Sequence, residues 1–260
     1  MSNILHHNHI PFILKHEYEI AKEAITSLNA TNGGIEIYPI SGYVLHSLFL
    51  RLTGAQEQKL KCICWEMACR DFEYRYERFE RNHYSECSDY KDKNMVYKDL
   101  LDGIRKHDEK FVVTDSIKEE VIRDWRSETH KLFDKSLLAD HYRKQYDYYK
   151  TIEASVQGDW IMDEKQLFKK GDSISSAEKE ATCGMALFEI FHNYVYKERN
   201  RCAHNTKSYQ QNLPSLTAMM AEDYKLQNYF MFMSVILLLD TIYVKLVRIY
   251  LEKLGELSLI

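Results

Sequence analysis

The segment YKERNRCAHN, residues 196–205, brings together side chains that could bind a phosphate group and transfer a proton. Arg199 carries a permanent charge, and its planar guanidinium can hold two phosphate oxygens at once. His204 titrates near neutral pH and can pass a proton to or from a sugar hydroxyl or a leaving oxygen. Asn200 can orient either of them through its amide group. We therefore take Arg199, Asn200 and His204 as the candidate catalytic residues.

The spacing of these three residues suits an α-helix. Asn200 and His204 are four positions apart, so they share one helix face. Arg199 lies about 140° from His204 around an ideal helix, because five steps of about 100° separate them. Three arrangements can still bring the arginine to the histidine. Its long side chain can curl round, the helix can be irregular, or a second copy of the chain can supply the partner group.

The residues around this segment offer no set of metal ligands. A phosphodiester cut by arginine, asparagine and histidine alone therefore needs a nucleophile from the substrate itself. The neighbouring 2′-hydroxyl supplies one in RNA and is absent from DNA. The sequence thus predicts cleavage of RNA without a metal ion or other cofactor.

The segment is basic, although the chain as a whole is acidic. The formal net charge of the 260 residues is −4, whereas residues 191–210 carry four lysine or arginine side chains against one glutamate, a net charge of +3. A binding site needs only a local field, so the overall charge does not exclude a nucleic acid. We expect Lys197, Arg201 and Lys207 to contact RNA. Tyr209 could stack on a base, or belong to a loop with no special role.

The run RNRCAH, with Arg199, the polar Asn200 and His204, resembles the R-x4-6-H motif of the HEPN superfamily. The resemblance covers about residues 175–260 and could extend back to about residue 116. It implies a compact helical bundle and a metal-independent endoribonuclease of the kind found in bacterial defence, toxin and RNA-guided systems. By the family pattern, Arg199 would stabilise the phosphate, Asn200 would position it, and His204 would be the general acid and base.

The same resemblance implies partners for the chain. Members of the family usually dimerise so that two motifs face each other, which predicts a homodimer with a composite active site. RNA is the expected substrate, and a protein or nucleic acid could act as the activator. A place in antiviral defence or in a toxin system follows from the family alone.

Two other segments fit the bare motif, namely RFERNH at residues 78–83 and RDWRSETH at residues 123–130. The first has Phe79 where a polar residue is expected, and its histidine continues an aromatic stripe. The second lies in a heavily charged helical segment that needs such residues on its surface. Only the copy at residues 199–204 ends an apolar helix and precedes a polar loop, so it is the favoured one.

The cysteines predict a reducing compartment. The six cysteines do not follow a signal peptide, because the N-terminus MSNILHHNHIPF has neither a basic start nor a long apolar run. Free thiols in a cytoplasmic protein are the expected state. Cys62, Cys64 and Cys69 lie in a helical pattern with no Cys-x-x-Cys pair or spaced histidine to complete a tetrahedral zinc site. We predict no metal.

The elements that must position these residues are all expected to be helices. Glycine (9) and proline (3) are scarce, so few positions force a helix to stop. The most apolar segment begins at Tyr229, and Asp240 and Lys245 interrupt it before the roughly 20 residues that a membrane span needs. We predict a buried central helix and no membrane association. The fold class is all-α, a multi-helix bundle with long antiparallel helices and a HEPN-like C-terminal part.

Local signals place the individual helices. Gly54 should break the early helical pattern, and IEIYPI should form a short strand or, because of Pro39, an extended linker. Residues 1–110 form an N-terminal helical region of unknown role, and residues 111–260 a HEPN-like domain, unless both belong to one continuous domain. The expected helices cover residues 15–29, 41–51, 55–82, 89–106, 116–155, about 175–204 and 223–254.

Two functions of different classes are compatible with this sequence. The first is the RNA endonuclease described above. The second is a non-catalytic helical interaction or regulatory module that binds RNA, a nucleotide or a protein partner. A simpler origin of the cations also stays open, because Lys197, Arg199, Arg201 and His204 could merely complement the negative C-terminal end of the helix dipole.

Overall fold

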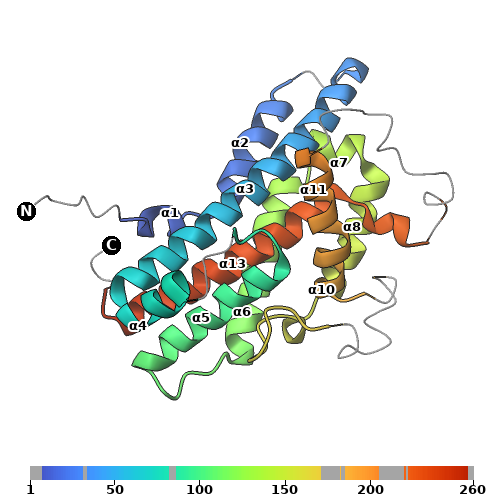
Figure 1. Cartoon of the computed structure of the whole chain (residues 1–260). Coiled ribbons are helices and arrows are strands. Elements are labelled where there is room, and N and C mark those ends of the chain that lie inside the picture. The colour runs from blue at the N-terminus through green and yellow to red at the C-terminus, as the bar shows by residue number, and fades with distance from the viewer. Residues whose placement is uncertain are drawn as a thin grey trace, which may run out of the picture.

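The computed structural model describes residues 8–31, 34–81, 86–170, 182, 185–204, 220 and 222–256, and only the backbone of Ile35, Arg81, Ala203, His204, Glu222 and Asp223. Over these residues the protein is an all-α bundle (Figure 1), as predicted. Its helices are α1 (Ile10–Leu14), α2 (Tyr18–Asn29), α3 (Tyr38–Arg70), α4 (Phe72–Arg75), α5 (Tyr90–His107), α6 (Asp115–Phe133), α7 (Leu137–His141), α8 (Arg143–Ser155), α10 (Leu187–Ile190), α11 (Tyr196–His204) and α13 (Tyr229–Lys253).

Shorter turns join these helices. The 3-10 turns are η1 (Ile35–Ile37), η3 (Gly158–Trp160) and η7 (Glu222–Leu226), and the π-helical segments are η2 (Tyr76–Arg81) and η5 (Phe191–Val195). One antiparallel bridge joins Ile161 to Phe168. It lies in the irregular stretch that separates α8 from the segment carrying α10 and α11.

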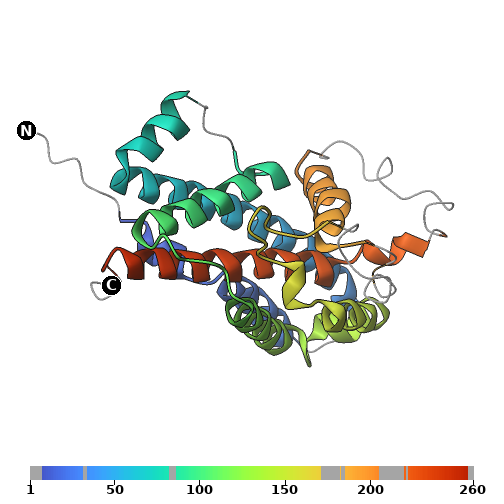
Figure 2. The ribbon, with the colours of Figure 1, turned by 90° about the horizontal axis from the view of Figure 1, so that it is seen from below.

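Helix α13 lies at the centre of the bundle. Its first amides are capped by the Asn228 side chain, which accepts from Phe230 and Met231. Helices α3, α5, α6 and α8 pack around it, and Figure 2 shows it running between α5 on one side and α6 and α8 on the other. By length and composition it could cross a membrane, but 89% of its most apolar window is buried inside the protein. The prediction of a buried central helix is confirmed.

A buried ion cluster fixes α3 and the start of α2 to α13. The Lys59 ammonium of α3 contacts the Asp240 carboxylate of α13, and it also donates to the Lys15 carbonyl at 2.7 Å. The Glu17 amide donates to the second Asp240 oxygen at 2.9 Å, and the His16 Nδ1 lies 3.3 Å from that oxygen. Burial alone would raise the pKa of Asp240, but the adjacent His16 ring, the charge and hydrogen bond of Lys59, and the hydrogen bond from the Glu17 amide hold it below its usual value.

Helix α3 corrects two expectations about the N-terminal region. It runs without a break through Gly54, where a Cβ would meet no neighbouring atom. A helical glycine costs only about 1 kcal/mol, and buried side chains on both sides, among them Leu52 and Gln56, outweigh that cost. IEIYPI forms neither a strand nor a linker. It forms η1 and the first turn of α3, where Pro39 needs no amide hydrogen bond.

Two expected long helices are divided. Asp71 is extended (φ −131°), and its side chain caps α4 by accepting from the Tyr74 amide at 3.0 Å, so the helix expected over residues 55–82 ends at Arg70. The segment 116–155 forms α6, α7 and α8 because Lys135 adopts a positive φ of 63° after α6. The Ser136 side chain then caps α7.

The hydrophobic core extends across residue 110. Buried side chains from Ile10 to Leu251 belong to one cluster. Helix α13 packs on α3 and α5 as well as on α6 and α8. The division into 1–110 and 111–260 stays a prediction.

Asp240→Asn is expected to lower the free energy of unfolding by about 3–5 kcal/mol, because it removes the carboxylate that contacts the buried Lys59 ammonium directly and leaves only Glu17, at 3.9 Å. Urea unfolding followed by circular dichroism measures this. Asp102→Asn is the matched control, since Asp102 is exposed and lies 3.8 Å from Arg105. It should cost less than about 1 kcal/mol. Equal losses in the two variants would contradict the importance of the buried cluster.

Glu17→Gln is expected to be more stable than the wild type, by a margin that grows from pH 4 to pH 8. Both carboxyl oxygens of Glu17 are buried without a hydrogen-bond partner, and burial followed by the Asp240 charge raises the pKa of Glu17. A raised carboxyl pKa adds stability at low pH that is lost as pH rises above the pKa of unfolded glutamate. Glutamine does not titrate. Unfolding free energies at several pH values test this, and a margin that shrinks with rising pH would refute it.

Candidate functional site

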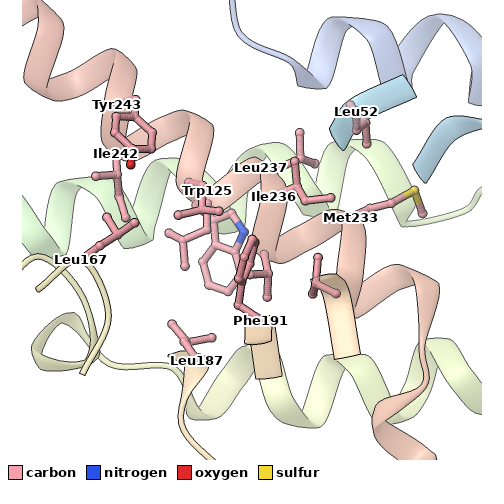
Figure 3. Packing of buried hydrophobic residues seen from close by; sticks show 14 of the residues in the cluster. Leu52, Trp125, Leu167, Leu187, Phe191, Met233, Ile236, Leu237, Ile242 and Tyr243 are labelled. Carbon is pink, nitrogen blue, oxygen red and sulfur yellow. The ribbon is translucent and has the colours of Figure 1, made fainter. Parts of the chain in front are cut away.

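The segment that leads to the motif is anchored in the core. Helix α10 starts after Ala186, whose amide donates to the Glu189 carboxylate at 3.0 Å. Leu187 and Phe191 belong to the same buried cluster as Trp125 of α6 (Figure 3), and the Trp125 indole nitrogen donates to the Ser234 carbonyl of α13 at 2.9 Å. The expected start of this helix near residue 175 lies outside the described residues.

A π-helical turn separates α10 from α11. It spans Phe191–Val195, and α11 follows directly from Tyr196 to His204. π-Helical turns are rare and occur often at functional sites. Helix α11 packs against α3 (Figure 1), so the motif lies beside a helix that is far from it in sequence.

Arg199 is held from two sides. Its Nη2 donates to the Glu57 carboxylate of α3 at 2.9 Å, and its Nη1 donates to the Asn200 side-chain oxygen at 3.1 Å. The arginine side chain remains 25% exposed, against 15% for Glu57. The structure therefore brings Arg199 and Asn200 together and adds Glu57 to the site. The carboxylate was not predicted, because it lies 142 residues away in the sequence.

A second cation, Lys93 of α5, is electrostatically coupled to this pair. It is fully buried, and its ammonium donates to the Cys87 carbonyl at 2.7 Å. Burial lowers the pKa of Lys93 to about 8. The Glu57 carboxylate opposes this shift, and the Arg199 guanidinium adds to it. A lysine with this pKa changes charge within the range in which many enzymes work.

Another polar cluster anchors α11 to α13. The buried Glu198 carboxylate accepts from the Tyr229 hydroxyl and from Arg201, whose Nε lies 2.7 Å away. Burial alone would raise the pKa of Glu198, but these hydrogen bonds hold it below its usual value. Cys202 also donates to Glu198, at 3.3 Å, and burial together with that negative charge raises the pKa of its thiol to about 11.

His46 of α3 adds an imidazole to this cluster. Its ring centroid lies 4.7 Å from that of Tyr229. Burial lowers the pKa of His46, and the Glu198 charge opposes the shift. Sequence spacing gave no sign of this histidine, because α3 and α11 meet only in the folded chain.

The remaining candidate residues are placed as follows. Lys197 is exposed on α11. His204 is the last residue of α11, described for its backbone only, and Lys207 and Tyr209 lie outside the described residues. Arg199 and Arg201 both bind carboxylates, so Glu57 and Glu198 account for their positions more directly than the helix dipole does.

In the two other segments that fit the motif, the described arginine and histidine side chains contact acidic residues. Arg78 is buried and pairs with Asp99 at 3.0 Å. Arg123 is exposed beside Asp124, while His130 contacts Glu153 at 3.0 Å. His83 lies outside the described residues. The choice of the copy at residues 199–204 stays a prediction.

Metal ligands do not gather in the part of the chain described by the structure. No group of three or more His, Cys, Asp or Glu side chains there is placed to hold a metal ion. The described cysteines are free thiols. Of the three expected not to form a zinc site, Cys62 and Cys64 are buried and Cys69 is exposed.

Comparison of the chain with protein-family models, curated proteins and solved structures found no match in any of the three.

Glu198→Gln is expected to destabilise the protein by about 1.5–3 kcal/mol, because hydrogen bonds to a charged acceptor are worth about that much. Thermal unfolding measures the loss. Glu128→Gln is the control, since Glu128 contacts the exposed Lys131. It should change little. If the control lost as much as Glu198→Gln, the anchoring role of Glu198 would be wrong.

Proposed function

We propose that this protein is a metal-independent endoribonuclease of the HEPN type. The observation that carries the proposal is the placement of Arg199, which Glu57 and Asn200 hold from two sides while a quarter of its side chain stays exposed. A fixed guanidinium that remains accessible suits a phosphate, because little reorganisation is needed when the anion binds. The motif RNRCAH supports the same reading through its resemblance to the HEPN pattern.

The faces of α11 favour a shared site between two copies. Val195 and Glu198 are buried against the bundle. On a helix of about 100° per residue, Asn200 and position 204 fall on roughly the opposite face. We propose that this face meets RNA or a second copy of the chain, in a homodimer in which two α11 helices approach each other.

The proposed reaction uses only the chain and its substrate. The 2′-hydroxyl attacks the adjacent phosphorus, and the bond to the 5′-oxygen of the next nucleotide breaks. His204 takes the proton from the attacking hydroxyl and returns a proton to the leaving oxygen, in one subunit or between two. Arg199 stabilises the negative charge that develops on the phosphate. The products are a 2′,3′-cyclic phosphate and a 5′-hydroxyl end.

The wild type is expected to cleave a mixed RNA pool in EDTA and to leave cyclic phosphate ends. Arg199→Ala and His204→Ala should each reduce the rate by about 100-fold or more, the range for loss of a general acid-base group. Arg123→Ala, in the competing copy of the motif, is the control and should retain full activity. Cleavage that persists in His204→Ala, or that needs a divalent ion, would refute the proposal.

A non-catalytic binding module is the second candidate. It is favoured by the internal ion pairs of the motif, because Arg199 and Arg201 both bind carboxylates of the same chain. It predicts that the wild type binds RNA, a nucleotide or a protein without cleaving RNA. In that case Arg199→Ala would weaken binding and change no rate.

A further inference from the structure

We propose that Glu57 is the positioning residue for Arg199. The inference rests on the proposed function, in which Arg199 binds the scissile phosphate. It adds one residue from α3 that lies outside the motif.

The position of Glu57 is fixed by the fold. Helix α3 is tied to α13 at Lys59, two residues further on, through the buried Asp240. Residues two apart on a helix lie about 200° apart around its axis, so Lys59 can face α13 while Glu57 faces α11. Glu57 is largely buried and accepts a hydrogen bond from Nη2 of Arg199, whereas the Asn200 side chain accepts one from Nη1. Both ends of the guanidinium fork are thus oriented.

Glu57→Gln is the first test. Glutamine keeps the shape of the side chain but not the charge, so we expect kcat for RNA cleavage to fall by on the order of 10–100-fold, with KM unchanged or lower. Glu66→Gln is a matched control on the same helix, because Glu66 is also largely buried and pairs with Arg70 at 2.6 Å. The control should retain kcat. Equal effects of the two substitutions, or a normal kcat in Glu57→Gln, would overturn the positioning role.

The wild type separates failure of this inference from failure of the proposed function. A wild type that never cleaves RNA would refute the proposed function. A wild type that cleaves RNA while Glu57→Gln keeps the same kcat would overturn the positioning role of Glu57 alone.

Discussion

The contact between Lys59 and Asp240 sets how α3 lies against α13, and the candidate site depends on that register. Both groups are buried, and a buried pair is costly unless its geometry and hydrogen bonds are good. Here the Lys15 carbonyl, the Glu17 amide and His16 complete the cluster. A slip of α3 along α13 would break these contacts together. The cluster therefore fixes the register of α3 against α13, and with it the position of Glu57.

Over the described residues, the candidate site has few unpaired positive charges, and its main cation, Arg199, is held in one orientation. The net charge of +3 on residues 191–210 already includes Glu198, which binds Arg201, and in the fold Glu57 brings one more negative charge to Arg199. Under the proposed function, affinity for RNA cannot come mainly from a large positive surface, and the net charge of −4 agrees with this. The phosphate would instead be recognised by one well-held guanidinium. The cluster of Glu198, Tyr229 and His46 keeps α11 fixed on its other side.

The fold class and several elements could be predicted because their signals are local. The apolar run after Tyr229 became α13, and the pattern over residues 89–106 became α5. The predictions at Gly54 and Pro39 were wrong because glycine and proline usually end helices. At Gly54 the packing of its neighbours keeps α3 continuous, and Pro39 lies in the first turn of α3, where proline is tolerated. The break at Asp71 depends on a capping hydrogen bond that apolar periodicity does not reveal.

The site itself was only partly predictable. Arg199 and Asn200 are adjacent, so their contact follows from spacing, but Glu57 comes from another helix. No pattern along the chain links residues 57 and 199. The available signal was indirect. Polar residues on the buried stripe of an apolar helix, such as Gln56 and Lys59 in α3, indicate an internal polar network without naming its members.

The most direct test of the central claim uses DNA oligonucleotides that contain a single ribonucleotide, one oligonucleotide for each base, incubated with the protein in EDTA. The account predicts one cut, directly 3′ of the ribonucleotide in at least one of the four, leaving a 2′,3′-cyclic phosphate. Replacing Arg199 by alanine should abolish the cut. Cleavage at deoxyribonucleotides, equal cleavage by Arg199→Ala, or no cut in any of the four would contradict it.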